Sequence, residues 1–217
     1  MPPKPASSAA RSHLRQEIDA IKRQGVLDEA SRQFFALGYE NASLDSIAEA
    51  LGVSKPFIYS RFASKNEILV ALCRFGSDSA LATIEFAGSL DGEPASRLGA
   101  VMAHFCELQI ERRQEVALIF REVKNIPPEV AAEIDSAKAS FHQMLREILQ
   151  EGIAAGQFAV SDISLTASAI GGMASWTYTW FQPSGRMSAQ EVARNVAGLA
   201  LRTAGVSDPD RYLVASG

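Results

Sequence analysis

The sequence of 217 residues has only two cysteines, two tryptophans and three histidines, and it lacks a long apolar run. A helix that spans a bilayer needs about 20 consecutive apolar residues, and no segment approaches that length. The first residues, MPPKPASSAARSH, also lack the apolar segment of a secretory signal. Cys73 and Cys106 lie in predicted helices, and two buried thiols suit a reducing compartment. We therefore expect a cytoplasmic protein with no membrane partner.

The sequence also lacks the short motifs that mark common enzyme classes. It contains no G-x-S-x-G elbow, no phosphate-binding loop, no closely spaced cysteine pair and no H-E-x-x-H. The three histidines, His13, His104 and His142, are far apart, and only His104 lies near a cysteine, Cys106. We expect no catalytic residues, no metal site and no cofactor, so the chain is not predicted to be an enzyme.

Residues 43–62, SLDSIAEALGVSKPFIYSRF, have the pattern of two short helices joined by a tight turn. Apolar residues recur at helical spacing on one face of the first helix: Leu44, Ile47, Ala48 and Leu51. Ser43 is a suitable N-cap, and Gly52 ends this helix because glycine adopts the left-handed conformation readily. Ser54 can cap the second helix, whose first turn tolerates Pro56. The segment therefore predicts a helix-turn-helix.

The second of these helices has the composition of a DNA-reading helix. It buries Ile58 and Phe62 and presents Lys55, Pro56, Phe57, Tyr59, Ser60 and Arg61. Residues 55–65 contain no acid, as expected of a surface that meets phosphates, whereas solvated helix faces usually mix both signs. We predict that these side chains enter the major groove, with Ser43 and Lys65 on phosphates. The alternative is an ordinary helical hairpin in an all-α core.

The net charge of −4 alone argues against a nucleic-acid partner, but the charge is unevenly distributed. Residues 1–65 hold 9 of the 21 basic and 7 of the 25 acidic side chains, which leaves 12 and 18 for residues 66–217. An acidic C-terminal part is repelled by DNA, so such a protein would approach DNA only through its basic N-terminal part. The distribution supports DNA binding.

The remaining sequence predicts an all-α fold without repeats. We expect a disordered arm at 1–13, a helix-turn-helix domain at 14–66 whose first helix has a candidate bend at Gly25, and a ligand-binding and dimerisation domain at 67–217. The larger domain is predicted to contain helices at about 64–87, 95–112, 114–124, 128–155, 162–182 and 188–204. Loops with Gly or Pro separate them.

Residues 26–69 resemble the DNA-binding domain of the tetracycline-repressor (TetR) family of bacterial regulators. Three motifs match in order and spacing: FALGY at 35–39, IAEALGVS at 47–54 and YSRFASK at 59–65. Two positions depart from the common pattern, since Ala42 stands where threonine is frequent and Arg61 where histidine is usual. The resemblance implies a cytoplasmic bacterial homodimer that binds a palindromic double-stranded operator, usually as a repressor, and that a small-molecule effector releases.

The resemblance also implies that the C-terminal domain contains an effector pocket. Large flexible or aromatic side chains with a few polar atoms can enclose an apolar ligand. The candidates are Met102, Phe105 and Gln109 on one helix, Phe141 and Met144 on another, and Trp176. The alternative is that these side chains only fill a core.

In the TetR family the last two long helices of each subunit form a dimer bundle, and the resemblance implies that role for the corresponding helices here, which combine small residues with large aromatics. Trp176 and Trp180 share one helix face, and Ala193, Ala197 and Gly198 lie on the last helix. Small residues beside large ones let another helix approach closely, so we predict a dimer interface at these five residues. The alternative is a helix pair within one chain.

Residues 172–185, GMASWTYTWFQPSG, are similar to TetR regulators that respond to acyl-CoA thioesters. This narrower resemblance implies an apolar effector with an anionic head. The predicted function is therefore that of a ligand-responsive transcriptional regulator, a repressor whose effector is an acyl-CoA or another apolar molecule. The alternative is an all-α lipid or acyl carrier without specific DNA binding.

Overall fold

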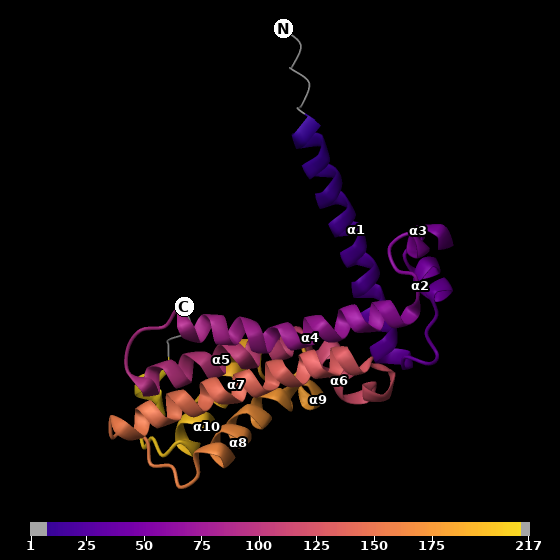
Figure 1. Cartoon of the computed structure of the whole chain (residues 1–217). Coiled ribbons are helices and arrows are strands. Elements are labelled where there is room, and N and C mark those ends of the chain that lie inside the picture. Colours follow the sequence, from indigo (N-terminus) through magenta and orange to yellow (C-terminus); the bar gives the residue numbers. More distant parts are fainter. Residues whose placement is uncertain (1–7, 214–217) are drawn as a thin grey trace. The chain divides into compact units, whose positions relative to one another are not determined.

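The computed structural model describes residues 8–213, which form a chain of helices without a β-strand (Figure 1). The predicted all-α class is thus confirmed for this part of the chain. In order, the elements are α1 (Ser8–Leu37), α2 (Leu44–Ala50), α3 (Lys55–Tyr59), α4 (Lys65–Gly88), α5 (Pro94–Glu111), α6 (Arg113–Arg121), the 3-10 helix η1 (Val123–Asn125), α7 (Pro128–Ala154), α8 (Ile163–Ser175), α9 (Thr177–Trp180), α10 (Ala189–Thr203) and the 3-10 helix η2 (Pro209–Tyr212). None of the helices described is both long and apolar enough to cross a bilayer.

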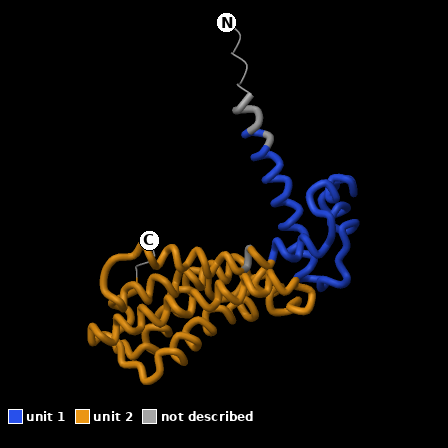
Figure 2. Tube along the Cα trace, in the orientation of Figure 1, with its two compact units in different colours: residues 1–72 blue, residues 73–217 orange. Residues whose placement is uncertain are grey.

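The chain divides into two compact units, residues 1–72 and 73–217 (Figure 2). The division falls inside α4, somewhat later than the predicted boundary at residue 66. The reason is packing, because Ile68, Leu69 and Leu72 near the start of α4 are buried with the N-terminal unit. We call residues 1–72 the reader unit and residues 73–217 the C-terminal unit.

Helix α1 is longer than predicted. It begins at Ser8, so residues 8–13 are helical and the prediction of a disordered arm is wrong for them, while residues 1–7 lie outside the described part. The helix also continues through Gly25 without ending. Glycine inside a helix costs about 1 kcal/mol relative to alanine, and the burial of Val26, Leu27 and Phe34 just beyond it favours continuation.

The C-terminal unit is a helical bundle in which α5 is central. This helix packs along α10 and also against α7, α8 and α9. Its inner face contains the predicted side chains Met102, Phe105 and Gln109, which are all buried, as are Leu98 and Cys106. One close approach elsewhere in the bundle depends on glycine, because a Cβ at Gly152 would lie 2.0 Å from the Phe158 ring.

The predicted helix at 162–182 is divided into α8 and α9 at Trp176. Thr177 is buried, and its hydroxyl donates a hydrogen bond of 2.7 Å to the Ala174 carbonyl. A hydroxyl that binds a carbonyl of the preceding turn competes with the main-chain ladder and bends helices. Trp176 and Trp180, predicted to share one helix face, are both exposed, whereas Tyr178 between them is buried.

Candidate nucleic-acid interface

Helix α2 begins with a complete capping box. The Ser43 hydroxyl accepts from the Ser46 backbone N–H at 3.0 Å, and the Ser46 hydroxyl accepts from the Ser43 backbone N–H at 3.1 Å. These bonds satisfy two donors that a helix start otherwise leaves unpaired. Ser43 is thus the N-cap that the sequence predicts, and it stays exposed beside the start of the helix.

The turn between α2 and α3 follows the predicted pattern. Gly52 has φ +64°, and the next residue, Val53, donates its N–H to the Ala48 carbonyl at 3.0 Å. A residue with a Cβ is strained at this φ, which is why glycine suits the position. Helix α3 then begins at Lys55 with Pro56 in its first turn, although the Ser54 side chain makes no capping bond.

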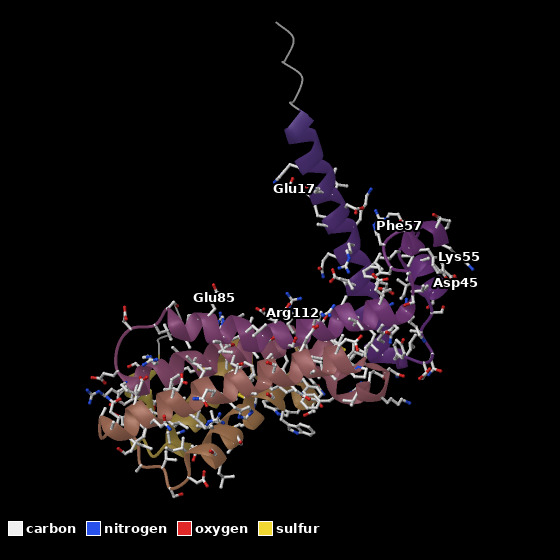
Figure 3. The ribbon with its side chains drawn as sticks, viewed as in Figure 1. Glu17, Asp45, Lys55, Phe57, Glu85 and Arg112 are labelled. Atoms are coloured by element: carbon white, nitrogen blue, oxygen red, sulfur yellow. The ribbon has the colours of Figure 1, made fainter. Side chains whose placement is uncertain are left out.

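Helix α3, on which Figure 3 labels Lys55 and Phe57, has a buried side and an exposed side. Ile58 and Phe62, which follows the helix, are fully buried. The Tyr59 side chain is 53% exposed, and Phe57 is half-buried. The other exposed residues of the predicted reading set are Lys55, Pro56 and Ser60. The arrangement offers an aromatic hydroxyl, an aliphatic hydroxyl and a cation at one short helix.

Lys55 is paired with an acid from the neighbouring helix. Its Nζ lies 2.5 Å from Oδ2 of Asp45, and both side chains are exposed. The Asp45 carboxylate raises the pKa of Lys55 through this hydrogen bond and through its charge. A phosphate that binds Lys55 must therefore compete with Asp45.

Arg61 lies mostly inside the reader unit. Its Nη2 is 2.6 Å from Oδ1 of Asp19 on α1, and its Nη1 donates to the Phe57 carbonyl and the Ser60 hydroxyl, each at 3.0 Å. The guanidinium carbon also lies 3.9 Å from the Phe57 ring centroid, a cation–π geometry. In this structure the guanidinium that the sequence predicts to contact DNA is engaged by groups within the domain.

Lys65 fastens the loop between α1 and α2. Its ammonium donates to the carbonyls of Tyr39, Glu40 and Ala42 at 2.7, 3.3 and 3.1 Å, and it lies 4.3 Å from the Tyr39 ring centroid. An ammonium has three N–H donors, so these carbonyls occupy all of them. In this arrangement Lys65 has no donor left for the phosphate contact that the sequence predicts.

The acids that face this site come from outside the acid-free segment 55–65. Asp45 lies on α2, and Asp19 lies on α1, 42 positions before Arg61. A composition argument confined to the second helix misses both of them. Asp45 belongs to the same helix-turn-helix as its partner and was accessible to sequence reasoning, whereas only the fold brings Asp19 to Arg61.

The C-terminal unit contains a small, partly open apolar cavity of about 60 Å³. Helices α4 to α8 all contribute to its lining: Ser77, Ala80, Phe105, Gln109, Val116, Ile119, Phe120, Ile134, Ala137, Lys138 and Ser175. Only two of these, Phe105 and Gln109, were predicted from the sequence. Lys138 Nζ lies 5.6 Å from the centroid of the half-exposed Phe120 ring, which places one cation beside the cavity.

The other predicted ligand residues have different surroundings. Phe141 packs on Phe105 with ring centroids 4.1 Å apart, and Met102 is fully buried in the core. Trp176 is exposed and does not line the cavity. Met144 lines a separate open groove of about 570 Å³ between α4, α5 and α7. This groove carries the carboxylates of Glu147 and Glu151 together with Arg97, which pairs with Glu151.

The five residues of the predicted dimer interface fall into two groups. Trp176 and Trp180 are 58% and 47% exposed. In contrast, Ala193 and Ala197 are fully buried in the core of the same chain, and a Cβ on the buried Gly198 would lie 3.4 Å from Leu213. The inner side of α10 therefore packs within the chain and has no free surface for a partner.

The two cysteines are free and buried. Burial raises the pKa of each thiol to about 12, so neither is a reactive thiolate at neutral pH. Within residues 8–213 the described side chains form no group of three or more His, Cys, Asp or Glu suited to hold a metal ion.

Two family models match the two units of the chain. Residues 26–72 match the model described as bacterial regulatory proteins of the tetR family, and residues 91–204 match the tetracyclin repressor-like C-terminal domain. The second match covers more than half of the sequence.

The curated relatives include both a transcriptional activator and a transcriptional repressor. The transcriptional activator FasR of Mycolicibacterium smegmatis is 32% identical over 116 residues, which are 54% of this chain and 53% of FasR. The match thus spans about half the length of FasR. The transcriptional repressor KstR2 of the same organism is 24% identical over 89% of this chain and 95% of its own length.

Solved structures match over most of the chain. The TetR family regulator PfmR from Thermus thermophilus is 32% identical with a TM-score of 0.74, over 82% of this chain and 97% of PfmR. AibR, in a complex with isovaleryl coenzyme A and operator DNA, is 28% identical with a TM-score of 0.69, again over 82% of this chain and 97% of AibR.

Proposed function

Because the chain belongs to the TetR family of bacterial transcription regulators, we propose that it is a cytoplasmic, ligand-responsive repressor that binds a palindromic operator as a homodimer. The family consists of regulators rather than enzymes, and its members usually bind operator DNA as dimers and leave it when a ligand binds. For this chain we propose repression rather than activation, a homodimeric assembly and release from DNA by a small-molecule effector.

The observation that carries the proposal is the outward side of α3. This side exposes Lys55, Tyr59 and Ser60, whereas Ile58 on the opposite side is fully buried. A hydrophobically anchored helix with an exposed polar and aromatic side is what a major-groove reader requires. We propose that these residues, with Pro56 and Phe57, contact the groove and that Ser43 meets a phosphate.

Arg61 and Lys65 are assigned supporting roles in this proposal. Their contacts with Phe57 and with the loop carbonyls support a function in holding the reading helix and the loop before it. They would then affect DNA binding through the geometry of α3 rather than through a direct contact.

Selection from a library of random duplexes tests DNA recognition without knowledge of the operator. The wild-type protein should enrich a pseudo-palindrome whose half-sites are about 34–36 Å apart, one helical turn. Tyr59→Ala should enrich no sequence while its thermal unfolding stays unchanged, since this side chain is exposed. A wild-type protein that enriches nothing would overturn the proposal.

An apolar, exposed side of α8 supports the homodimer. Leu165, Ala169, Gly172 and Trp176 recur at helical spacing and are all exposed, with Leu165 at 69%. Exposed tryptophan and leucine on one surface are typical of interaction sites. On α10, Leu199 is the large apolar residue that faces outward. We propose that these sides of α8 and α10 meet their copies in a partner subunit.

Sedimentation at micromolar concentration tests this assembly. Leu165→Glu and Leu199→Glu should each shift the protein from dimer to monomer, because a buried unpaired charge is costly. Gly198→Arg is a poor test, since Gly198 is buried within its own chain and a large charged side chain there would disturb the fold as well as any interface. A monomeric wild type would contradict the proposed dimer.

An acyl-CoA is the proposed effector. The apolar cavity with the Gln109 amide and with Lys138 beside it suits an acyl chain with a polar or anionic head, and the AibR structure contains isovaleryl coenzyme A. Pockets for small molecules usually measure about 300–1,000 Å³, so the cavity of about 60 Å³ must expand on binding. Movement of Phe120, which is half-exposed, would open it.

A panel of CoA thioesters tests the effector. A matching thioester should stabilise the free protein and dissociate it from the selected operator; by linkage, the DNA-bound form must bind it less tightly by the same factor. A broad panel without either effect would reject the acyl-CoA assignment and leave the regulator assignment intact.

A further inference from the structure

The N-terminal part of α1 precedes the segment that matches the family model. We call residues 8–25 the extension, because the match begins at residue 26. The extension contacts the chain just after α3 at two points. Asp19 pairs with Arg61 at 2.6 Å, and the Arg23 guanidinium carbon lies 4.5 Å from the Phe62 ring centroid. A segment outside the matched domain thus contacts the end of the reading helix.

The Arg61 guanidinium is held by one ionic contact and several neutral ones. The neutral contacts are with the Phe57 carbonyl, the Ser60 hydroxyl and the Phe57 ring. Its side chain is only 11% exposed, and its Nε is buried without a hydrogen-bond partner among the described residues. Asp19, which is exposed, supplies the opposite charge. Its loss would leave a cation with an unsatisfied donor beside the reading helix.

We propose that Asp19 is a specificity-determining positioning residue, which withholds the Arg61 guanidinium from DNA phosphates. Carboxylate and phosphate both suit the planar fork of an arginine, so they compete for it. Nonspecific affinity comes almost entirely from phosphate contacts, whereas specificity comes from base contacts. Because Asp19 pairs with the Arg61 guanidinium, it lowers the affinity for nonspecific DNA more than the affinity for the operator. This inference rests on the proposed DNA binding.

The test measures the salt dependence of binding to a nonspecific duplex by fluorescence anisotropy. Each phosphate that a protein neutralises adds about 0.9 to the slope of log K against log salt. Asp19→Asn should steepen this slope by about one and raise affinity at low salt. A protein in which Asp19 only stabilises the fold would keep its slope, so the slope separates the two roles.

Further variants make the result specific to Arg61. Glu17→Gln removes the same charge from the same helix, where Figure 3 labels Glu17 and where its carboxylate lies 3.4 Å from Nδ1 of His13. Its slope should equal that of the wild type. Asp19→Asn combined with Arg61→Gln should return the slope to the wild-type value. Asp19→Glu preserves a carboxylate and should behave as the wild type.

The outcomes distinguish the inference from the proposed function. A wild-type protein that binds no duplex at low salt overturns the proposed function itself. If the wild type binds, the inference is overturned when Asp19→Asn has the slope of Glu17→Gln, when it binds more weakly than the wild type, or when its steeper slope persists without Arg61.

Discussion

The reader unit and the C-terminal unit use side chains in different ways. In the reader unit, polar groups determine the geometry, since Ser43 caps α2, Lys65 binds three loop carbonyls and Arg61 joins α1 to α3. In the C-terminal unit, the candidate ligand residues Phe105 and Gln109 are themselves buried. In the reader unit the structural cations Arg61 and Lys65 therefore differ from the proposed contact residues Lys55 and Tyr59, whereas a change at the cavity affects ligand and stability together.

The largest expected effect tests whether the two units are independent. Phe62→Ala removes a fully buried ring from the reader unit, which typically costs about 3–5 kcal/mol. We expect DNA binding to be lost. Hydrogen exchange should show faster exchange in residues 26–72, while residues 95–204 keep their protection. Equal loss of protection in both units would mean that they unfold as one cooperative structure.

A smaller effect should separate a structural cation from a contact cation. Lys65→Met removes the donor of three loop carbonyls, two of them in part-buried hydrogen bonds, and a lost hydrogen bond of this kind costs about 1 kcal/mol. Urea unfolding should therefore shift to lower concentration, and DNA binding should weaken with it. Lys55→Met is the control, because its exposed side chain should affect DNA binding and leave the unfolding curve in place. Unchanged stability of Lys65→Met would contradict the structural role.

The cavity and the groove of the C-terminal unit can be distinguished by a matched pair of glutamines. Gln109 lines the cavity, whereas Gln143 lines the groove and donates to Glu147 at 2.8 Å. Gln109→Leu should raise the effector concentration for half-release from DNA about tenfold, the effect of about one lost hydrogen bond. Gln143→Leu should leave it unchanged. The opposite result would assign the effector to the groove.

The smallest expected effect is a pH dependence confined to the C-terminal unit. Burial and the nearby Arg146 lower the pKa of His142 from 6.5, and the ring lies beside Phe141 and Gly171. The unfolded chain then binds the proton more tightly than the folded protein, so stability is complete above pH 6.5 and declines as the pH falls below it.

Thermal unfolding between about pH 5 and 8 should show this decline as a shift of a few degrees. His142→Gln should reduce it, whereas His13→Gln, on the exposed extension, should not. A decline of unchanged size in the His142 variant would assign the pH dependence to other groups.

The elements of the reader unit follow from local features of the sequence. Helical periodicity, the Ser43 cap, the turn glycine Gly52 and the buried Ile58 and Phe62 are such features, and local rules describe them correctly. The positions of most helices in the C-terminal unit follow from the same periodicity and from the loops with Gly or Pro between them. The break at Trp176 was missed because it depends on a buried threonine hydroxyl, whose burial no local pattern reveals.

Which side chains are free to act depends instead on tertiary packing. The fold brings Asp19 to Arg61 and three carbonyls to Lys65, contacts that join residues 23 to 42 positions apart. It also directs Ala193 and Ala197 into their own core and collects the cavity lining from five helices. Periodicity states which side of a helix is apolar, but the packing of the whole chain decides what covers that side.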